Sequence, residues 1–175
     1  GLTCESLTGQ LLESGIQLDF ERGAYSSLRF HDWFQQLAGR PIDLAELRTA
    51  ASDIFELNAP MAPLLDQLRG NGHRLVLLSN TSEFHFDYIR ERYDILDRFD
   101  DFVLSYRAGA VKPDARIYET ALNVIQCAPH ECFYTDDIAA YVEAGRTHGL
   151  DGEVFTTPES LREQLARRGI RLSPN

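Results

Sequence analysis

The sequence predicts an α/β protein in which a parallel sheet lies between two helical layers, preceded by a smaller helical part. From residue 59 onward, short apolar runs typical of strands alternate four times with helical patterns. This alternation favours parallel strands joined by right-handed crossovers. Before residue 59, apolar residues recur at helical spacing and no strand-like run interrupts them. We therefore expect a helical cap subdomain over residues 1–58 and a three-layer, Rossmann-like α/β core over residues 59–175.

The first 58 residues contain three helical runs of apolar side chains. Gly39-Arg40-Pro41 ends the second run, and Asp43 is placed to cap the third. We expect the aromatic side chains of residues 30–34 to pack in a small core rather than to line a substrate pocket. His31 and His85 have no evident partner groups, so we expect them to be packing or surface residues rather than ligands. The apolar positions are Leu7, Leu11 and Leu12, then Phe30, Trp33, Phe34 and Leu37, then Leu44, Leu47 and Ala51.

The core is expected to contain four strands and the helices between them. The run from Arg74 to Ser79 is nearly continuously apolar, which is typical of a parallel strand covered on both faces. Gly70-Asn71-Gly72 ends the helix before it, and Pro113 and Pro158 open later helices. The expected strands are 74–79, 102–105, 132–135 and 152–155, and the expected helices are 60–69, 83–92, 114–126, 138–148 and one that begins at Pro158.

Composition excludes several classes of protein. The chain has 175 residues, 43% of them hydrophobic, which suffices for one packed domain with a modest addition. Its net charge of −10 disfavours nucleic acid and anionic membrane as partners, and no apolar run approaches a membrane span. Three cysteines do not form a disulfide framework, so we expect a cytoplasmic location. A zinc site at Cys127, His130 and Cys132 is disfavoured because no second ligand pair exists.

Polar groups follow three of the expected strands. These are Ser79-Asn80, Lys112 in the loop after strand 102–105, and the adjacent carboxylates Asp136 and Asp137. The carboxyl ends of parallel strands are where α/β folds bind ligands. Two adjacent carboxylates repel each other unless a cation lies beside them, and Mg²⁺ is a suitable one. Together these groups can hold a phosphoryl group and spread its charge. The alternative for the two aspartates is a surface helix cap.

Three segments resemble motifs II, III and IV of the haloacid dehalogenase-like (HAD) hydrolase superfamily. They are Leu77-Leu78-Ser79-Asn80-Thr81, the run Val111-Lys112-Pro113-Asp114-Ala115-Arg116-Ile117-Tyr118, and Phe133-Tyr134-Thr135-Asp136-Asp137. Their order and spacing match, and the resemblance extends over about residues 18–157. Phe20-Glu21-Arg22-Gly23 is similar to a segment in the helical cap of bacterial members that act on sugar phosphates.

The resemblance implies a role for each of the polar groups. Ser79 would bind a phosphoryl oxygen, and Asn80 would contribute its backbone N–H. Lys112 would neutralise the charge of the nucleophile and of the phosphoryl group. Asp136 and Asp137 would hold Mg²⁺ directly or through water. The implied activity is Mg²⁺-dependent hydrolysis of a small phosphorylated metabolite, such as a sugar phosphate, through an aspartyl-phosphate. Dehalogenation is less favoured, because the dehalogenase branch needs no metal.

One motif of the family is absent from these 175 residues. Motif I is an apolar strand that ends in Asp-x-Asp, and its first aspartate is the nucleophile. Leu18-Asp19-Phe20-Glu21 is a degenerate alternative, but it has too little apolar character for a central strand. Because Gly1 stands in place of Met, we expect a truncated chain. We expect it to be inactive as given, to bind Mg²⁺ weakly, and to have one aspartate neutralised by protonation or by Lys112. A non-catalytic relative that binds phosphate or a partner is the alternative.

The absent strand has a structural consequence as well. In the superfamily it lies between the strand that ends at Ser79 and the strand that ends at Asp136. Its absence leaves two inner edges with unpaired backbone groups, which are costly when buried and adhesive when exposed. Three outcomes are open: the two strands close up, another chain fills the position, as in a homodimer or a strand-exchanged dimer, or the fold tolerates the defect.

Overall fold

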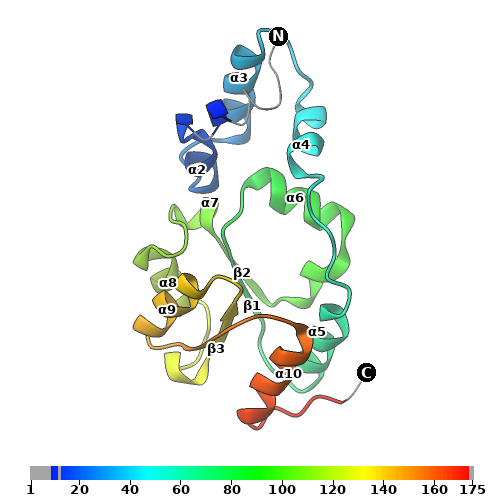
Figure 1. Cartoon of the computed structure of the whole chain (residues 1–175), viewed down its shortest axis with the longest axis vertical. Coiled ribbons are helices and arrows are strands. Elements are labelled where there is room, and N and C mark those ends of the chain that lie inside the picture. Colours follow the sequence, from blue (N-terminus) through cyan, green and yellow to red (C-terminus); the bar gives the residue numbers. More distant parts are fainter. Residues whose placement is uncertain (1–8, 12, 174–175) are drawn as a thin grey trace.

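The computed structural model describes residues 9–11 and 13–173. Its first part contains the helices α2 (Ile16–Glu21), α3 (Ser27–Ala38) and α4 (Leu44–Ser52), and no strand occurs among the described residues before Val76. Leu7 and Leu12, two of the expected apolar positions, lie outside the described residues. Figure 1 shows these helices stacked beyond the end of the α/β part. No helix in the described ranges is both long and apolar enough to span a bilayer.

The second part alternates strands and helices as the sequence predicts. Boundaries differ from the expected ones mostly by one or two residues. The largest difference is the helix expected over 114–126, which ends at Leu122 with Asn123 as its C-cap; Gln126 then has a φ of 60°. The elements are α5 (Met61–Gly70), β1 (Val76–Ser79), α6 (Glu83–Arg92), η1 (Asp94–Arg98), β2 (Asp101–Leu104), α7 (Ser105–Ala108), α8 (Ala115–Leu122), η2 (Pro129–Glu131), β3 (Phe133–Asp136), α9 (Ala139–Thr147), β4 (Asp151–Val154) and α10 (Pro158–Arg167).

All strand pairs are parallel, which confirms the predicted fold class. β1 pairs with β2, with Val76 opposite Asp101, and β3 pairs with β4, with Phe133 opposite Asp151. The four strands form two separate two-stranded sheets instead of one continuous sheet. No backbone hydrogen bonds join β1 to β3. Of the three outcomes expected for the absent strand, closure of β1 onto β3 is therefore not observed.

Side-chain caps explain where several helices begin. The side chains of Ser26, Asp43, Ser82, Asp114 and Thr157 each accept a hydrogen bond from a backbone N–H in the first turn of the helix that follows. These bonds satisfy donors that have no partner within the helix. Local sequence therefore fixes the starts of α3, α4, α6, α8 and α10.

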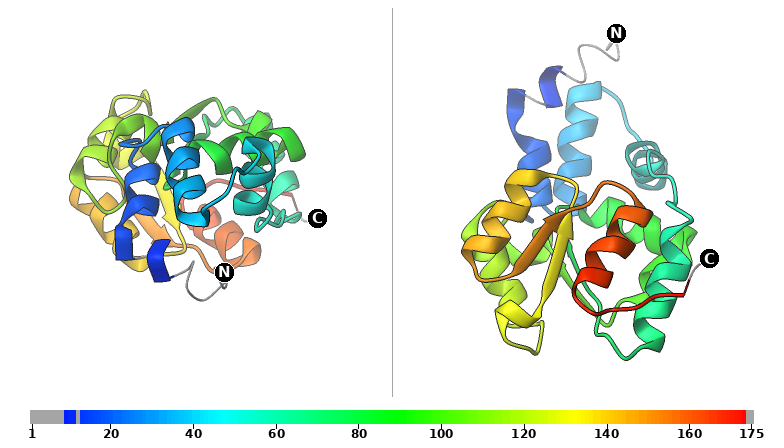
Figure 2. Two further views of the ribbon diagram at one scale, coloured as in Figure 1. Left: turned by 90° about the horizontal axis from the view of Figure 1, so that it is seen from above. Right: turned by 60° about the horizontal axis from the view of Figure 1, so that its bottom comes forward.

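Two hydrophobic clusters cover opposite faces of the strands. On one face, side chains of α8 and α9 pack on Val76, Leu78 and Tyr134. On the other face, side chains of α5 and α10 pack on Leu75 and Phe133. Alternate residues of β1 and of β3 thus contribute to opposite layers, as the two-residue period of a strand requires. The second view of Figure 2 shows helices on both sides of the strands.

The N-terminal helices have an aromatic core of their own, as the sequence predicts. The rings of Phe20 and Phe30 stack with centroids 4.5 Å apart, and Phe84 of α6 meets both edge-on. Trp33 and Phe34 pack around Phe30. Because Asp19 lies within α2, the segment Leu18–Glu21 is helical and is not a degenerate catalytic strand. Each of the two expected packing histidines donates a ring N–H to a backbone carbonyl, His31 to Ile42 and His85 to Ala51.

Contacts with α6 and α7 hold the N-terminal helices against the α/β part. Arg48 of α4 forms a two-pronged ion pair with Glu91 of α6, with N···O distances of 2.9 and 2.8 Å. Gly23, with a φ of 72°, lies so close to the Tyr106 carbonyl that a Cβ atom would fall 2.0 Å from its oxygen. Only glycine fits this position, both for its φ and for the close approach.

Candidate active site

The carboxyl end of β1 contributes Ser79 and Asn80 to the site. Ser79 is the last residue of the strand and is half-buried, and its hydroxyl has a long contact of 3.4 Å with the Asn80 carbonyl. The next residue, Thr81, is fixed more firmly, because the Ser105 hydroxyl accepts from its N–H at 2.9 Å and donates to its carbonyl at 2.8 Å. The backbone after β1 is thus fixed to the start of α7, while the Ser79 hydroxyl keeps only a weak partner.

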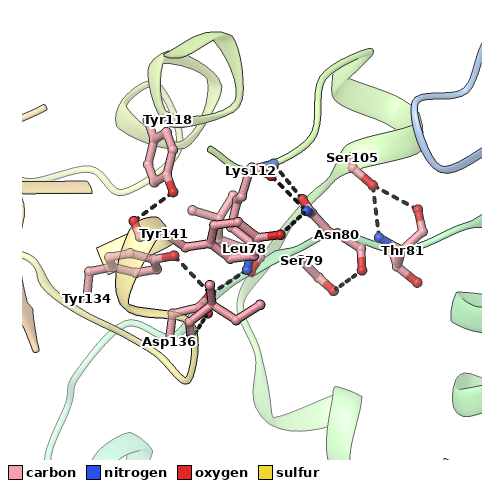
Figure 3. Close-up of polar contacts among 11 residues, drawn as sticks. Leu78, Ser79, Asn80, Thr81, Ser105, Lys112, Tyr118, Tyr134, Asp136 and Tyr141 are labelled. Carbon is pink, nitrogen blue, oxygen red and sulfur yellow. Dashed lines mark hydrogen bonds and ion pairs between the residues drawn. The ribbon is translucent and has the colours of Figure 1, made fainter. Parts of the chain in front are cut away.

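The Asn80 side chain holds the backbone of Lys112. Its amide oxygen accepts from the Lys112 N–H at 2.6 Å, and its amide nitrogen donates to the Lys112 carbonyl at 3.1 Å. The same nitrogen lies 3.4 Å from the Tyr141 hydroxyl. Two bonds to the backbone of one residue fix both the position and the orientation of the loop (Figure 3). This role of the Asn80 side chain is additional to the backbone role that the family resemblance implies.

Lys112 joins the two sheets at their carboxyl ends. Its ammonium donates to the Leu78 carbonyl of β1 at 3.1 Å and lies 2.5 Å from a carboxylate oxygen of Asp136 in β3. Both side chains are almost completely buried, with 8% and 7% of their surface exposed. A buried pair of this kind is stable only with close geometry and further hydrogen bonds. Figure 3 shows Lys112 between Leu78 and Asp136.

Three tyrosines surround this ion pair. The Tyr134 hydroxyl donates to Asp136 at 3.0 Å, and the Tyr118 hydroxyl donates to the Tyr141 carbonyl at 2.7 Å. The Tyr141 ring lies 5.1 Å from the Lys112 ammonium, a favourable distance for a cation–π contact. Burial, and then the charge of Asp136, raise the pKa of Tyr134. Burial raises the pKa of Tyr118 to about 12. Both hydroxyls therefore remain protonated donors at neutral pH.

Asp136 and Asp137 have different surroundings although they are adjacent. The second Asp136 oxygen accepts from the Ile138 N–H at 3.0 Å, so both oxygens of this carboxylate are engaged. The Asp137 side chain is exposed. Asp136, Asp137 and Thr135 line an open depression of about 500 Å³ that Phe155 and Met61 also border. The depression gives solvent and small ligands access to the carboxyl end of β3.

The oxygen donors at this site suit a divalent cation only in part. Mg²⁺ takes six oxygen ligands and commonly uses one or two carboxylates, with water and phosphate oxygens completing the set. Asp137 offers a free carboxylate, but Asp136 is already neutralised by Lys112. Within the described ranges, no three His, Cys, Asp or Glu side chains gather into a metal-binding group. The residues present therefore fit only a weakly held Mg²⁺.

The structure thus brings together four of the five residues that sequence reasoning selected. Ser79, Asn80, Lys112 and Asp136 lie at the facing ends of β1 and β3, and Asp137 lies at the rim. Sequence reasoning missed Tyr134 and Tyr141. Tyr134 lies inside the segment resembling motif IV, so its place two residues before Asp136 was visible. No signal in the sequence marked Tyr141, which reaches the site from α9.

Comparison with known proteins agrees with this geometry. The family model for haloacid dehalogenase-like hydrolases matches residues 13–149, which is most of the chain. The chain belongs to this family. The HAD-like hydrolase is 30% identical over 149 residues to a sesquiterpene phosphatase of Aspergillus oryzae, with 82% of this chain and 74% of the relative covered. It is 26% identical over 147 residues to a D-ribitol-5-phosphate phosphatase of Bacteroides thetaiotaomicron, with 79% of this chain and 70% of the relative covered.

Solved structures show the same fold for this HAD-like hydrolase. A HAD family enzyme of Bacteroides thetaiotaomicron, BT-2542, aligns with a TM-score of 0.81 at 21% identity, covering 93% of this chain and 83% of that one. The same enzyme has been crystallised with magnesium and inorganic phosphate. A predicted HAD-like hydrolase of Porphyromonas gingivalis aligns with a TM-score of 0.78 at 22% identity, covering 95% of this chain and 84% of that one.

Proposed function

We propose that the site at the ends of β1 and β3 serves the hydrolysis of a small phosphomonoester by this HAD-like hydrolase. The observation that supports this most is the position of Lys112. Asn80 fixes its backbone, and its ammonium lies between the two sheets beside Asp136. A fixed cation at this place can neutralise a phosphoryl group bound at the Ser79 hydroxyl and the nearby backbone N–H groups. The phosphatases among its relatives are consistent with this substrate class.

In this proposal each residue has one role. Ser79 donates its hydroxyl to a phosphoryl oxygen, which the weak contact of that hydroxyl leaves it free to do. Lys112 turns from Asp136 toward the phosphoryl oxygens and balances their charge. Asp136 and Asp137 hold Mg²⁺, which when bound supplies further charge neutralisation. The helices of residues 1–58 act as a cap, and residues 59–175 form the core. Free Cys127 and Cys132 thiols are compatible with a cytoplasmic location.

We further propose that the 175 residues do not turn over substrate by themselves. Phosphoryl transfer in this family needs a nucleophilic aspartate. The described aspartate that contacts Lys112 is Asp136, which this proposal assigns to Mg²⁺ and not to attack on phosphorus. Asp19, the one alternative considered from the sequence, lies in α2 among the N-terminal helices. Lys112 and Ser79 orient a phosphate but do not attack it, because Lys112 is ion-paired and Ser79 has no basic group as a hydrogen-bond partner.

The test is a turnover assay with two proteins. The 175-residue chain and a version extended by its natural upstream residues are incubated with Mg²⁺ and a panel of phosphomonoesters. The panel contains sugar phosphates, polyol phosphates, prenyl phosphates and p-nitrophenyl phosphate. We expect turnover by the extended protein only, reduced by Lys112→Met. Exposed Arg90→Met, on α6, is the matched control. If neither protein hydrolyses any member of the panel, the proposal of phosphatase activity is wrong.

The second candidate function is non-catalytic binding of phosphate or of a partner. The separation of β1 from β3 favours it, since a site divided between two sheets retains its binding groups while lacking an attacking group. Binding of inorganic phosphate to the extended protein without turnover of any phosphomonoester would support this alternative.

A further inference from the structure

Two cysteines flank the turn that leads into β3. Cys127 precedes η2, and Cys132 follows η2 directly and begins the run into β3. Neither thiol is in a disulfide. A zinc site that also uses His130 is disfavoured, and neither thiol belongs to the site at the carboxyl ends of β1 and β3. The proposed function therefore leaves this pair of thiols without a role.

Three hydrogen bonds fold the turn back on itself. The Glu131 N–H donates to the Ala128 carbonyl at 2.9 Å, and the Cys132 N–H donates to the Pro129 carbonyl at 3.1 Å. The Glu131 carboxylate accepts from the Ala128 N–H at 3.0 Å. The Cα atoms at the two ends of such a four-residue turn lie less than about 7 Å apart. Cys127 and Cys132 stand directly outside the turn, one on each side of it.

The two thiols contact each other across this turn. Ala128 and Cys132, the residues on either side of η2, both have an extended backbone. The Cys127 thiol forms a side-chain hydrogen bond with the Cys132 thiol. The Cys132 sulfur also has a long contact of 3.9 Å with the Phe133 carbonyl. Because a disulfide joins residues whose Cα atoms lie about 4.4–6.8 Å apart, residues that face each other across a closed turn are suitably placed to form one.

The two thiols differ in their access to solvent. Cys127 is exposed, whereas Cys132 is half-buried. Burial, and then the neighbouring Cys127, raise the pKa of the Cys132 thiol to about 11. Because the thiolate is the reactive form, a dissolved oxidant meets Cys127 first, and Cys132 reacts afterwards. An exposed attacking thiol thus lies beside a less accessible resolving thiol.

We propose that Cys127 and Cys132 form a reversible dithiol–disulfide site whose oxidant is glutathione disulfide. The Cys127 thiolate attacks one sulfur of the oxidant, and the first glutathione leaves as a thiolate and takes up the proton that Cys127 lost. The Cys132 thiolate then attacks the Cys127 sulfur, and the second glutathione leaves and takes up the proton that Cys132 lost. One disulfide is reduced to two thiols while two cysteine thiols are oxidised to one disulfide, so electrons and protons balance.

Formation of this disulfide would constrain the entry to β3. The bond closes the short loop of residues 127–132 and removes conformational freedom mainly from the unfolded chain. The Cys132 carbonyl accepts from the Asp151 N–H at 3.1 Å, a bond at the start of the ladder between β3 and β4. Gly149 also lies against the turn, because a Cβ atom at this residue would lie 3.3 Å from Pro129. Oxidation therefore acts on the start of β4 as well as on the turn.

The test needs neither Mg²⁺ nor substrate, so its result is independent of the phosphatase proposal. The chain with Cys4→Ser, which removes the third cysteine of the sequence, is equilibrated with mixtures of reduced and oxidised glutathione. Free thiols are blocked by alkylation, and the chain is cleaved after glutamate residues. Because Glu131 lies between the two cysteines, their peptides stay joined only if the disulfide has formed. We expect joined peptides, which dithiothreitol separates when it is added before alkylation.

Two single variants separate the roles of the thiols. In Cys132→Ser no resolving thiol remains, and we expect glutathione to accumulate on Cys127 as a stable mixed disulfide. In Cys127→Ser the half-buried Cys132 should take up glutathione at least about tenfold more slowly than Cys127 does in Cys132→Ser. Oxidation of the chain with both thiols should raise its melting temperature by several degrees, and dithiothreitol should reverse the rise. Neither variant should show this rise.

Comparison of the folded with the unfolded chain decides whether the native contact matters. At one fixed glutathione mixture, the ratio of disulfide to dithiol should be at least about tenfold higher in buffer than in concentrated urea, because the folded turn holds the two thiols together. An equal ratio in the two conditions would overturn the proposal. Glutathione that remains on Cys127 beside a free Cys132 thiol would overturn it as well.

Discussion

The ammonium of Lys112 lies 2.5 Å from the carboxylate of Asp136, and the pair connects two sheets that share no backbone hydrogen bond. One partner comes from the loop before α8 and the other from the last residue of β3. Their exposed fractions of 8% and 7% mean that neither charge is solvated well enough to exist alone. The pair therefore has a structural role in addition to the role proposed in phosphate binding.

Breaking this pair should destabilise the fold. Lys112→Met leaves a buried carboxylate without a cation, and we expect a loss of about 3–5 kcal/mol of unfolding free energy. Adding Asp136→Asn to Lys112→Met should recover part of the loss, with a coupling of about 1 kcal/mol or more. Urea denaturation of the unaltered chain, of the two single variants and of the double variant measures this coupling free energy. In contrast, Arg74→Met should cost less than about 1 kcal/mol, since its partner Asp101 is exposed. If the losses of unfolding free energy caused by Lys112→Met and Asp136→Asn simply add in the double variant, the two side chains are not coupled.

Magnesium binding by this chain should be weak. Lys112 competes for Asp136, and only Asp137 remains a free carboxylate in the described site. Calorimetric titration should show an affinity no tighter than the millimolar range. Lys112→Gln should tighten binding by freeing Asp136, provided that the variant folds, and circular dichroism checks this. Micromolar affinity of the unaltered chain that disappears in Asp136→Asn would contradict the expectation.

Phosphatase turnover should be absent from the 175-residue chain. Loss of one member of a nucleophilic catalytic unit reduces the rate by about 10⁴–10⁶-fold. Release of inorganic phosphate from p-nitrophenyl phosphate, followed over hours at high protein concentration, is the sensitive readout. Equal and robust turnover by the chain and by its extended version would mean that a residue within the 175 attacks the phosphorus. Asp19→Asn would then test the remaining carboxylate considered from the sequence.

The close approach of Gly23 to Tyr106 makes a prediction about the N-terminal helices. Gly23→Ala places a Cβ atom against the Tyr106 carbonyl in addition to straining a left-handed backbone. Gly39→Ala is the matched control, because its φ of 65° causes similar strain while no atom lies within 4 Å of the added Cβ. We expect Gly23→Ala to be less stable than Gly39→Ala by about 1–3 kcal/mol. Denaturation followed by the fluorescence of Trp33, the only tryptophan in the sequence, measures the unfolding free energies of both variants. Equal losses would show that the contact is unimportant.

His85 should make stability depend on pH. Burial lowers its pKa, an effect only partly offset by its hydrogen bond to Ala51 and the charge of Glu21. The unfolded chain therefore binds a proton at higher pH than the folded chain does. Stability should fall as the pH drops below about 6.5, the unfolded pKa, and should recover as the pH rises above it. Unfolding free energies at pH 5.5 and 7.5 test this. If His85→Gln leaves the difference between the two pH values unchanged, His85 is not its source.

The sequence by itself determined the elements and the polar groups that follow them. The apolar run before Ser79 and the run before Asp136 required covered parallel strands, and caps such as Asp114 fixed where helices begin. Because parallel strands place their carboxyl ends together, Ser79, Asn80, Lys112 and Asp136 were predictable as one site. The helical pattern around Phe30 likewise predicted an aromatic core, since such periodicity depends only on local geometry.

Only the tertiary structure decided how the sheets pair and which partners the charges take. Pairing of β1 with β2 and β3 with β4 depends on which edges meet, and no periodicity in one strand encodes its neighbour. The neutralisation of Asp136 by Lys112, 24 residues apart, and the contact of Tyr141 with both Asn80 and Lys112 arise from packing of separate elements. Local sequence sets the shape of each element, whereas the burial of long-range partners sets the chemistry where they meet.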